Sequence, residues 1–370
     1  MHYYLPFPED EFMSRYSRHI ILSEIGPEGQ NKLLRAKVLV IGAGGLGCPA
    51  LQYLAAAGIG QLGIIDFDVV EESNLHRQIL FGTSSLGVNK ALAAKERLED
   101  LNPTIAINAY PFKLTVENAL ELFSGYDVIL DGSDNFATRY LVNDAAVIID
   151  KPVVYGAIYK FEGQVSVFNY QNGPSYRCLF PDPPKDGSVA NCAEVGVLGV
   201  LPGIIGSMQA NEVIKIILGF DGVLSGRLLC YNSRSAEVTS LKIAKSPSEY
   251  KKIRERGDRF QEYYGEEFCA SVPSEISSEM ATKMENVQYI DVRELHEKPR
   301  LDRVDCLEIP MGELENRLDE IDSEKNKIIF CQTGVRSKTA VSLLQKHNIA
   351  NCMSLQGGVL EMMEQKKQIL

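Results

Sequence analysis

The sequence predicts an α/β protein with two domains, and three observations lead to that prediction. Short apolar runs typical of buried strands alternate with helical patterns through residues 1–245, which indicates a parallel sheet flanked by helices. A glycine-rich turn follows the first of these runs. The composition then shifts to Lys, Arg, Glu and Tyr, so we expect a flexible linker over 246–271 and a smaller α/β domain over 272–370.

Charge and composition exclude several classes of protein. The chain holds 38 Lys and Arg against 49 Asp and Glu, a net charge of −11, which argues against nucleic acid as a partner. It has no run of eighteen apolar residues, so we expect no membrane span. Residues 1–10 carry acids and prolines where a secretory signal needs basic and apolar residues, which favours a cytoplasmic protein. The eight cysteines include no CxxC pair, a pattern that favours reduced thiols.

The first domain is organised around a glycine-rich turn. Residues 38–41 are apolar, Gly42, Gly44, Gly45 and Gly47 follow, and a helical pattern comes next. Glycines permit a tight turn and close approach of the backbone to a phosphate, and the helix supplies a positive end. The same turn could serve only to pack a strand on a helix, so the spacing alone leaves both interpretations open.

A second strand-like run gives the turn its context. Residues 62–65 are apolar and lead into Asp66 and Asp68. An acid therefore follows the glycines by about twenty residues, where a nucleotide's ribose hydroxyl is bound in dinucleotide-binding folds. We expect a nucleotide site at this position.

Further polar residues gather at the same predicted sheet edge. The segment 73–78 is polar and without regular period, and Lys90 stands near the start of a helical pattern. The strand-like run 126–130 leads toward Asp134 and Asn135 at the carboxyl edge, where open α/β sheets bind ligands. Carboxylates in that position either cap the next helix or bind magnesium.

The second domain has its sharpest signal at a cysteine that follows a strand. Cys331 begins a loop that ends at Arg336, just before a helical pattern. Loop amides and the helix's positive end favour a thiolate, and Arg336 adds a fixed positive charge. Such loops perform sulfur transfer through a persulfide or ester hydrolysis through a phosphocysteine; a cysteine that merely fills space is the third alternative. Four residues separate Cys331 from Arg336, which resembles the sulfurtransferase loop of rhodanese domains, whereas the similar phosphatase loop is one residue longer.

Two family resemblances follow from these motifs. The first domain, from about residue 10 to 243, resembles the ubiquitin-activating-like adenylyltransferases of bacterial sulfur carriers, the HesA/MoeB/ThiF family. This implies a Rossmann-like ATP-binding domain of the ubiquitin-activating type. Residues 272–370 resemble a rhodanese domain, also through the stretches 291–294 and 355–358, for which we expect structural roles. Fusion of the two occurs in that family.

The resemblance implies an ATP and Mg²⁺ site. Arg77 and Lys90 would neutralise the phosphates, and Asp134 would hold the magnesium ion. Arg18 would reach into the ATP site of a partner subunit, which implies a homodimer; a solvated helix face is the alternative for this arginine. The expected ATP contacts are Gly42, Gly44, Gly45, Asp66, Asp68, Ser73, Asn74, Arg77, Gln78, Lys90, Asp134 and Asn135.

The chain departs from the family pattern in its cysteines. Many members carry two CxxC pairs for structural zinc, but here only Cys178 stands at the first position and no pair follows residue 243. A single thiolate cannot make a tetrahedral site, so we expect no zinc site. Cys192 matches a loop cysteine that in some members forms a thioester or disulfide with the carrier; an exposed loop thiol is the alternative.

These observations predict an enzyme that adenylates the C-terminal Gly-Gly carboxylate of a small ubiquitin-like sulfur carrier. A persulfide on Cys331, loaded from thiosulfate or a persulfide donor, would then supply sulfur to give a thiocarboxylate. A molybdopterin, thiamine or related sulfur pathway is implied by the resemblance. The glycine turn alone also fits an NAD-dependent oxidoreductase, and a carrier-docking scaffold with an inactive rhodanese domain is a third alternative.

Overall fold

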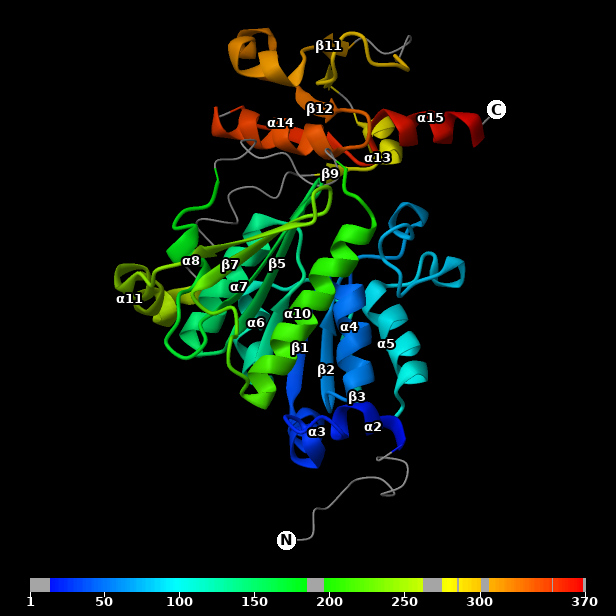
Figure 1. Cartoon of the computed structure of the whole chain (residues 1–370). Coiled ribbons are helices and arrows are strands. Elements are labelled where there is room, and N and C mark those ends of the chain that lie inside the picture. The colour runs from blue at the N-terminus through cyan, green and yellow to red at the C-terminus, as the bar shows by residue number, and fades with distance from the viewer. Residues whose placement is uncertain are drawn as a thin grey trace. The chain divides into compact units, whose positions relative to one another are not determined.

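The computed structural model describes residues 14–184, 196–261, 275–284, 286–300, 306–347 and 349–368. Two compact units divide the chain, Met1–Tyr263 and Tyr264–Leu370. Cys192, one of the predicted site residues, lies outside the described residues. Figure 1 labels the elements of both units.

The first unit contains one eight-stranded sheet in the order β3-β2-β1-β4-β5-β6-β7-β8. The five strands on the β3 side are parallel, as predicted, whereas β6, β7 and β8 are antiparallel to their neighbours. The direction changes after β5 because a two-residue turn leads directly into β6, and parallel neighbours would need a long crossover. The strands are β1 Lys37–Ile41, β2 Gln61–Ile65, β3 Ala106–Tyr110, β4 Val128–Asp131, β5 Val153–Tyr159, β6 Glu162–Phe168, β7 Arg227–Asn232 and β8 Glu237–Lys242.

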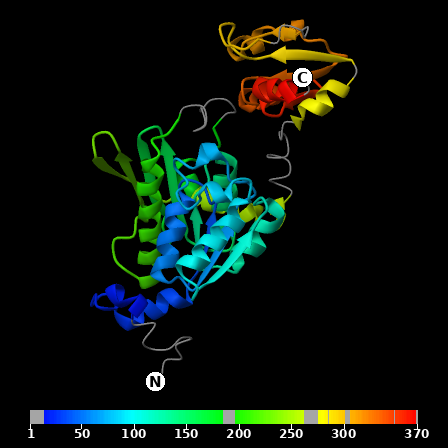
Figure 2. The same ribbon diagram turned by 90° about the vertical axis from the view of Figure 1, so that its right-hand side faces the viewer.

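Helices cover both faces of this sheet (Figures 1 and 2). On one face α10 packs against α4, β5 and β6, and α5 packs against α4 and β3; on the other α6 packs against α7. The central strand β1 has four consecutive buried residues, as expected for a strand covered on both sides. Across the described part of the chain, no helix has the length and apolar character that a membrane crossing requires. The helices are α2 Ser17–Ile20, α3 Gly26–Arg35, α4 Gly47–Ala57, α5 Lys90–Leu101, α6 Val116–Ser124, α7 Phe136–Ile148, α8 Tyr176–Leu179 and α10 Val200–Leu218, with short 3₁₀ turns at η1 Glu72–Asn74 and η2 Thr83–Ser85.

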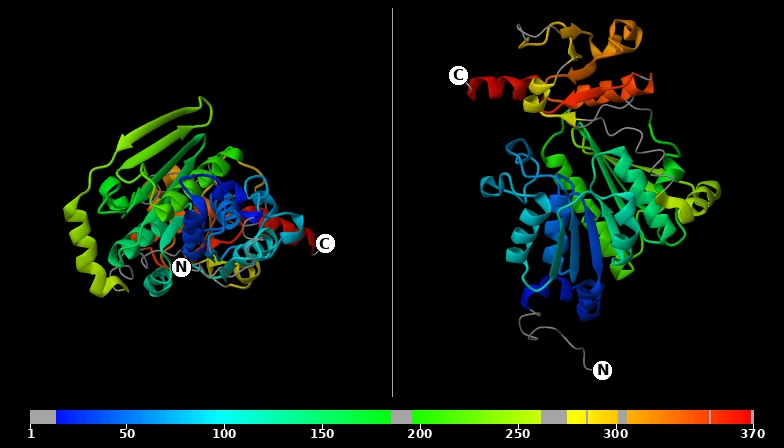
Figure 3. Two further views of the ribbon diagram at one scale, coloured as in Figure 1. Left: turned by 60° about the horizontal axis from the view of Figure 1, so that its bottom comes forward. Right: turned by 180° about the vertical axis from the view of Figure 1, so that it is seen from behind.

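The predicted flexible linker is wrong for its first part. Helix α11, Pro247–Arg256, follows β8 and is continued by the 3₁₀ turn η3, Gly257–Arg259. Tyr250 and Ile253 are buried against Val147 of α7, and Figure 3 shows α11 against the rest of the first unit. Charged residues dominate this helix, so its composition resembles a linker, but two apolar residues three positions apart are enough to dock one face.

Residues 171–184 hold four prolines and yet contain an ordered piece. Helix α8 is short, yet Ser175, Tyr176 and Arg177 are buried. The Tyr176 ring packs edge-on against Tyr140, and the Arg177 Nε atom lies 2.8 Å from an Asp144 carboxylate oxygen. Prolines suggested a loop here, but these aromatic and ionic contacts fix it to α7.

The second unit is a five-stranded parallel sheet in the order β11-β10-β12-β13-β9. Its core strands are β10 and β12, of which β12 is the strand that the sequence placed before Cys331. Two buried clusters, one on each side of the β12 pleat, contain Ile329 with Val341 and Phe330 with Val359. The elements are β9 Glu275–Ile276, α13 Ser278–Lys283, β10 Val287–Asp291, β11 Cys306–Glu308, η5 Met311–Asn316, η6 Leu318–Glu320, β12 Asn326–Phe330, α14 Val335–Lys346, β13 Cys352–Leu355 and α15 Gly358–Gln368.

Candidate functional site

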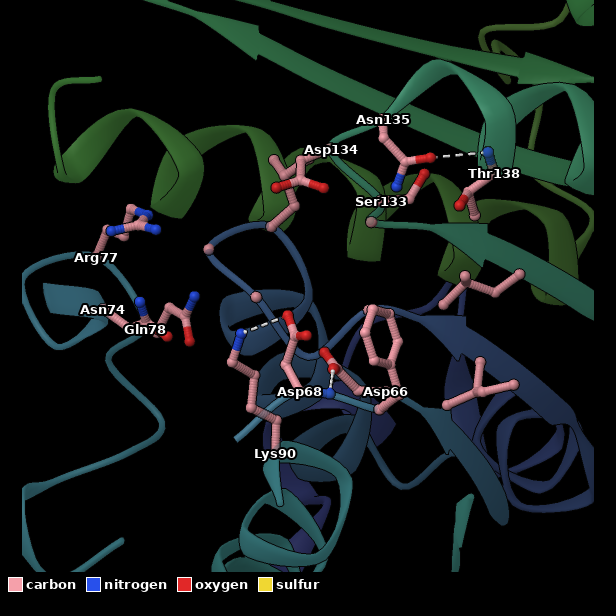
Figure 4. A pocket seen from close by; sticks show the side chains of 18 of the residues that line it. Asp66, Asp68, Asn74, Arg77, Gln78, Lys90, Ser133, Asp134, Asn135 and Thr138 are labelled. Carbon is pink, nitrogen blue, oxygen red and sulfur yellow. Dashed lines mark hydrogen bonds and ion pairs between the residues drawn. The ribbon is translucent and has the colours of Figure 1, made fainter. Parts of the chain in front are cut away.

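A cavity of about 840 Å³ opens at the carboxyl ends of β1, β2 and β4. All twelve of the expected ATP contacts line it, although they come from segments separated by up to ninety positions in the chain. Figure 4 shows the acidic and basic side chains of this cavity facing one another. The lining residues that the sequence predicted are Gly42, Gly44, Gly45, Asp66, Asp68, Ser73, Asn74, Arg77, Gln78, Lys90, Asp134 and Asn135.

The glycine turn is built for close backbone approach. Gly42 has a left-handed φ of +86°, and a Cβ atom on Gly47 would lie 1.9 Å from the Gly42 carbonyl oxygen, so both positions require glycine. A Cβ on Gly44 would meet only the Gln78 amide nitrogen, at 3.8 Å, so this residue faces open space. Helix α4 begins directly after the turn without a side-chain cap on its first amides. The turn therefore leaves backbone and a positive helix end facing the cavity.

Asp66 ties the glycine turn to the end of β2. One carboxylate oxygen accepts a hydrogen bond from the Ala43 N–H at 2.8 Å, and the other accepts from the Asp68 N–H at 2.9 Å. Burial raises the pKa of Asp66 above its ordinary value, and the two N–H groups oppose that shift. Each oxygen keeps a further lone pair for a ribose hydroxyl.

The two cations of the pocket have unequal partners. Lys90 is buried and its Nζ atom lies 3.1 Å from an Asp68 carboxylate oxygen, while the Asp68 side chain is half exposed. Arg77 donates from Nη1 to the Ser73 carbonyl oxygen at 2.9 Å and lies 3.0 Å from the His76 Nε2 atom. Arg77 is thus held by groups without negative charge, and Lys90 is held by a carboxylate at the pocket wall.

The loop after β4 divides its acids between two roles. Asn135 caps α7, since its Oδ1 atom accepts from the Thr138 N–H at 2.9 Å. Asp131 is buried and accepts from both the N–H and the hydroxyl of Ser133, at 3.0 and 2.6 Å, so it braces the loop from inside. Asp134 is exposed and points into the cavity (Figure 4). Of the two predicted uses of this loop, capping therefore belongs to Asn135, and the carboxylate available to a cation is that of Asp134.

Sequence reasoning missed Arg139, which is buried and also lines the cavity. Its guanidinium donates from Nη2 to the Ser133 carbonyl oxygen at 3.1 Å and lies over the rings of Phe136 and Tyr155. The signal was its position in the first turn of α7, where a cation opposes the helix dipole and so needs another stabilising partner. Arg139 holds the loop that presents Asp134.

Arg18 does not reach this cavity within its own chain. It is exposed on α2, and the neighbouring Tyr16 hydroxyl contacts Thr104, near the start of β3. Helix α2 lies at the amino edge of the sheet (Figures 1 and 2), whereas the cavity is lined by residues at the carboxyl ends of the strands. A role for Arg18 at an ATP site therefore requires a second copy of the chain.

In the second unit Cys331 lies at the end of β12 and is 1% exposed. The Gly334 N–H donates to the Cys331 sulfur at 3.2 Å, and the Ser337 hydroxyl lies 3.7 Å from it. We expected loop amides around the sulfur. Among the described residues, one backbone N–H, that of Gly334, donates to it. Gly358 packs closely against this loop, since a Cβ atom at this position would lie 2.4 Å from the Cys331 carbonyl oxygen.

Arg293 also supports the Cys331 loop. It is fully buried, pairs with Asp291 at 2.7 Å and donates to the Gln332 Oε1 atom at 2.9 Å. The stretch 291–294 thus anchors the loop, which agrees with the structural role expected for it.

Arg336, for which the sequence predicted a fixed positive charge, is paired with a carboxylate. Both guanidinium Nη atoms lie 2.6 Å from the two carboxylate oxygens of Glu297, a bidentate ion pair across 39 positions of the chain. The pairing lowers the pKa of Glu297 to about 2, so the acid is ionised and neutralises Arg336. No periodicity connects positions 297 and 336, and only the parallel strand order brings them together.

Cys178 has two serine neighbours. Its sulfur accepts from the N–H groups of Ser175 and Ser246, at 3.3 and 3.2 Å. Within the described ranges, no group of three His, Cys, Asp or Glu side chains is placed to hold a metal ion. The expectation of no zinc stays a prediction.

Comparisons with known proteins agree with this geometry. The model of the ThiF family matches residues 16–252. A sulfur carrier protein adenylyltransferase of Thermus thermophilus is 53% identical over 64% of this chain and 89% of its own length. A probable adenylyltransferase/sulfurtransferase, MoeZ of Mycobacterium tuberculosis, is 41% identical over 95% of this chain and 92% of its own. That match extends through the second unit.

Solved structures confirm the predicted Rossmann-like fold. Escherichia coli MccB with ATP has a TM-score of 0.55 at 24% identity, covering 63% of this chain and 72% of that chain. MccB with MccA-N7isoASN has a TM-score of 0.56 at 24% identity, covering 64% and 73%. The predicted family is likewise confirmed by the family model and by relatives aligned over most of the chain. This chain belongs to the ThiF family.

Proposed function

We propose that this enzyme adenylates the C-terminal carboxylate of a small sulfur carrier and replaces the AMP with sulfur carried on Cys331. One observation carries the proposal: the glycine turn, Asp66, Arg77, Lys90 and Asp134 line a single cavity. A nicotinamide enzyme would need the turn and Asp66 but gives no reason for two cations and an exposed carboxylate. The printed names of the relatives, sulfur carrier adenylyltransferase and adenylyltransferase/sulfurtransferase, support the same function.

The first step joins the carrier to AMP. A carboxylate oxygen of the carrier's terminal glycine attacks the α-phosphorus of ATP, and the bond to the bridging oxygen breaks as pyrophosphate leaves with the electron pair. Charge accumulates on the leaving phosphates, and Arg77 and Lys90 lie at the wall where it must be stabilised. Lys90 has to exchange Asp68 for phosphate, which its single 3.1 Å contact to a half-exposed partner permits.

Magnesium fits the residues that face this reaction. Asp134 offers an exposed carboxylate, and Asp131 and Arg139 fix the loop that bears it. An Mg²⁺ ion held by Asp134 would withdraw charge from the phosphate oxygens. The chain's own residues supply the remaining stabilisation through the glycine turn and the two cations.

The second step moves sulfur. The terminal sulfur of a Cys331 persulfide attacks the acyl carbon, and AMP leaves with the electron pair of the C–O bond. A second thiol then attacks the Cys331 sulfur, which releases the thiocarboxylate and leaves a disulfide for a cellular thiol to reduce. Cys192 is our candidate for this second thiol, and the thioester or disulfide suggested by its family position is the alternative. The donor that loads Cys331 is thiosulfate or a persulfide.

The partners are proposals of the same kind. Arg18 is exposed at the edge opposite the cavity, so completion of an ATP site by this residue requires a homodimer. Mixing inactive Arg18→Ala and Lys90→Ala proteins should restore activity in heterodimers if the sites are completed in trans. We propose no structural zinc, because Cys178 contacts serines, and elemental analysis of the purified protein tests this.

The decisive experiment is exchange of labelled pyrophosphate into ATP with each Gly-Gly carrier of the same organism supplied in turn. Exchange with one carrier identifies the substrate and with it a molybdopterin, thiamine or related pathway. Binding of NAD without exchange would favour an oxidoreductase. Binding of a carrier with neither pyrophosphate exchange nor a Cys331 persulfide would favour a carrier-docking scaffold with an inactive rhodanese domain.

A further inference from the structure

We propose that Glu297 is a specificity-determining residue that makes the Cys331 loop select sulfur donors of low charge, the persulfides of thiols, over the thiosulfate dianion. The inference rests on the proposed sulfur transfer and names the donor class for that site. It starts from the charge that surrounds the loop, because the donor must bring its outer sulfur to a cysteine that is 1% exposed.

Arg336 is the cation of the Cys331 loop with which an anionic donor could pair. It lies in the first turn of α14, the Cys331 thiol is among the groups that act on its charge, and its side chain is 32% exposed. A dianion entering the loop would pair with this guanidinium if it were free. Both Nη atoms already lie 2.6 Å from the Glu297 carboxylate oxygens. The guanidinium therefore has no free pair of parallel N–H donors for a second anion, and its charge is balanced by that of Glu297.

Glu297 is itself held in place. Its Oε1 atom accepts from the Glu294 N–H at 2.8 Å, and the Glu297 N–H donates to the Glu294 carbonyl oxygen at 2.9 Å, which closes a tight turn. The carboxylate is only 23% exposed, so it does not swing into solvent without losing both the turn contact and the ion pair. An incoming anion would therefore have to displace a fixed carboxylate.

The two other arginines of this region are paired as well. Arg293 pairs with Asp291 at 2.7 Å, and Arg300 pairs with Asp291 at 2.7 Å and with Glu308 at 3.3 Å. With the Arg336 pair, three arginines face three carboxylates and their charges cancel. These three arginines therefore provide no surplus positive charge for a dianion.

The chemistry of loading is the same for both donors. With a persulfide R–S–SH, the Cys331 thiolate attacks the outer sulfur, the S–S bond breaks, and R–S⁻ leaves with the electron pair while Cys331 holds the S–SH group. With thiosulfate, the thiolate attacks the outer sulfur and sulfite leaves as a dianion. Neither reaction needs an oxidant, so charge at the loop entrance decides between them.

The test measures how fast Cys331 of the full chain gains one sulfur, by mass spectrometry, from thiosulfate or from cysteine persulfide. In Glu297→Gln we expect the thiosulfate rate constant to rise about tenfold, since the dianion gains Coulomb energy from the uncovered arginine. The cysteine persulfide rate should change about twofold or less, because the reacting R–S–SH form of cysteine persulfide carries no net charge. The thiosulfate gain should shrink with added salt.

Two further variants keep the test decisive. Arg336→Gln leaves Glu297 unpaired and should lower the thiosulfate rate below wild type, and the double variant should return it toward wild type. Glu294→Gln removes an exposed charge from the same turn while keeping the ion pair, and should change the ratio of the two rates less than twofold. Equal changes for both donors in Glu297→Gln, or no change, would overturn the inference. A wild-type protein that gains no sulfur from either donor would instead refute the proposed sulfur transfer itself.

Discussion

The two sites of this chain treat charge in opposite ways. In the ATP cavity, charged groups remain available: Arg77 forms no ion pair with a carboxylate of the described residues, and Asp134 is exposed. In the Cys331 loop, Arg336 is matched to a carboxylate at 2.6 Å and the sulfur is buried. A site for a triphosphate needs charged groups without an opposite partner, whereas at the buried Cys331 sulfur the polar contacts are a backbone N–H and a hydroxyl.

Burial separates the two regions as well. The first cavity of about 840 Å³ can take a nucleotide and an extended peptide tail, a size typical of small-molecule sites. The Cys331 loop encloses one sulfur, contacted by the Gly334 N–H. One polypeptide thus carries an open, polar site and a small, buried one in two units that each have their own hydrophobic core.

The largest effect should come from removing the Cys331 sulfur atom, to which the transferred sulfur would be attached. Cys331→Ser should abolish thiocarboxylate formation from a persulfide donor while leaving pyrophosphate exchange unchanged, because the two reactions use separate units. Mass spectrometry of the carrier detects the gain of about 16 daltons on replacing oxygen by sulfur. Cys352→Ser, also buried in the second unit, serves as the matched control.

Normal thiolation of the carrier by Cys331→Ser, with free sulfide excluded, would remove the contrast between the two sites. The second unit would then not be the donor, and Cys192 would become the leading thiol.

The next effect concerns the charges left free in the first cavity. Lys90→Ala or Arg77→Ala should lower pyrophosphate exchange by about a hundredfold or more, the usual loss when one preorganised charge is removed from a transition state. Lys95→Ala is the control for Lys90, since Lys95 lies on the same helix and pairs with Glu99 outside the cavity. Equal exchange in Lys90→Ala, Arg77→Ala and the control would show that these cations do not act on the phosphates.

The sequence predicted the first site well because strand ends meet by rule. Gly42, Asp66 and Asp134 each follow an apolar strand, and the carboxyl ends of parallel strands share one edge. The positions at strand ends, together with the family resemblance, therefore named twelve residues that line one cavity, without knowledge of a single side-chain contact.

What the sequence did not predict are contacts set by tertiary packing. From the sequence, Arg139 looks like an ordinary residue of a helix, and only the structure shows its hydrogen bond to the Ser133 carbonyl oxygen. Glu297 reads as a surface acid until β10 and β12 pair and bring its turn beside Arg336. Helix α11 has a linker's composition and is fixed by two buried side chains, Tyr250 and Ile253. Such contacts have no local period, so a pattern along the chain cannot reveal them.

The smallest effect concerns how folding stability depends on pH, because acid should change the contributions of the two sites in opposite directions. Burial raises the pKa of Asp66 and Asp131 in the first unit, so their ionised forms oppose folding, and that penalty is relieved as the pH falls. The Arg336 guanidinium instead lowers the pKa of Glu297 from 4.5 to about 2. A depressed pKa means that the Glu297 pair stabilises fully above about pH 4.5 and is lost as the pH falls toward 2.

Glu297→Gln should therefore lower the unfolding free energy of the second unit by about 1 kcal/mol at pH 7, the value expected for a well-formed pair that is partly exposed. The difference from wild type should shrink steadily between pH 5 and pH 2, because the wild-type carboxyl then becomes uncharged like the amide. Calorimetry of the full chain at each pH measures it, with Glu294→Gln as the control for loss of a neighbouring charge. A difference that stays constant from pH 7 to pH 3 would mean that the pair contributes shape and not charge, and the contrast drawn between the two sites would lose its electrostatic basis.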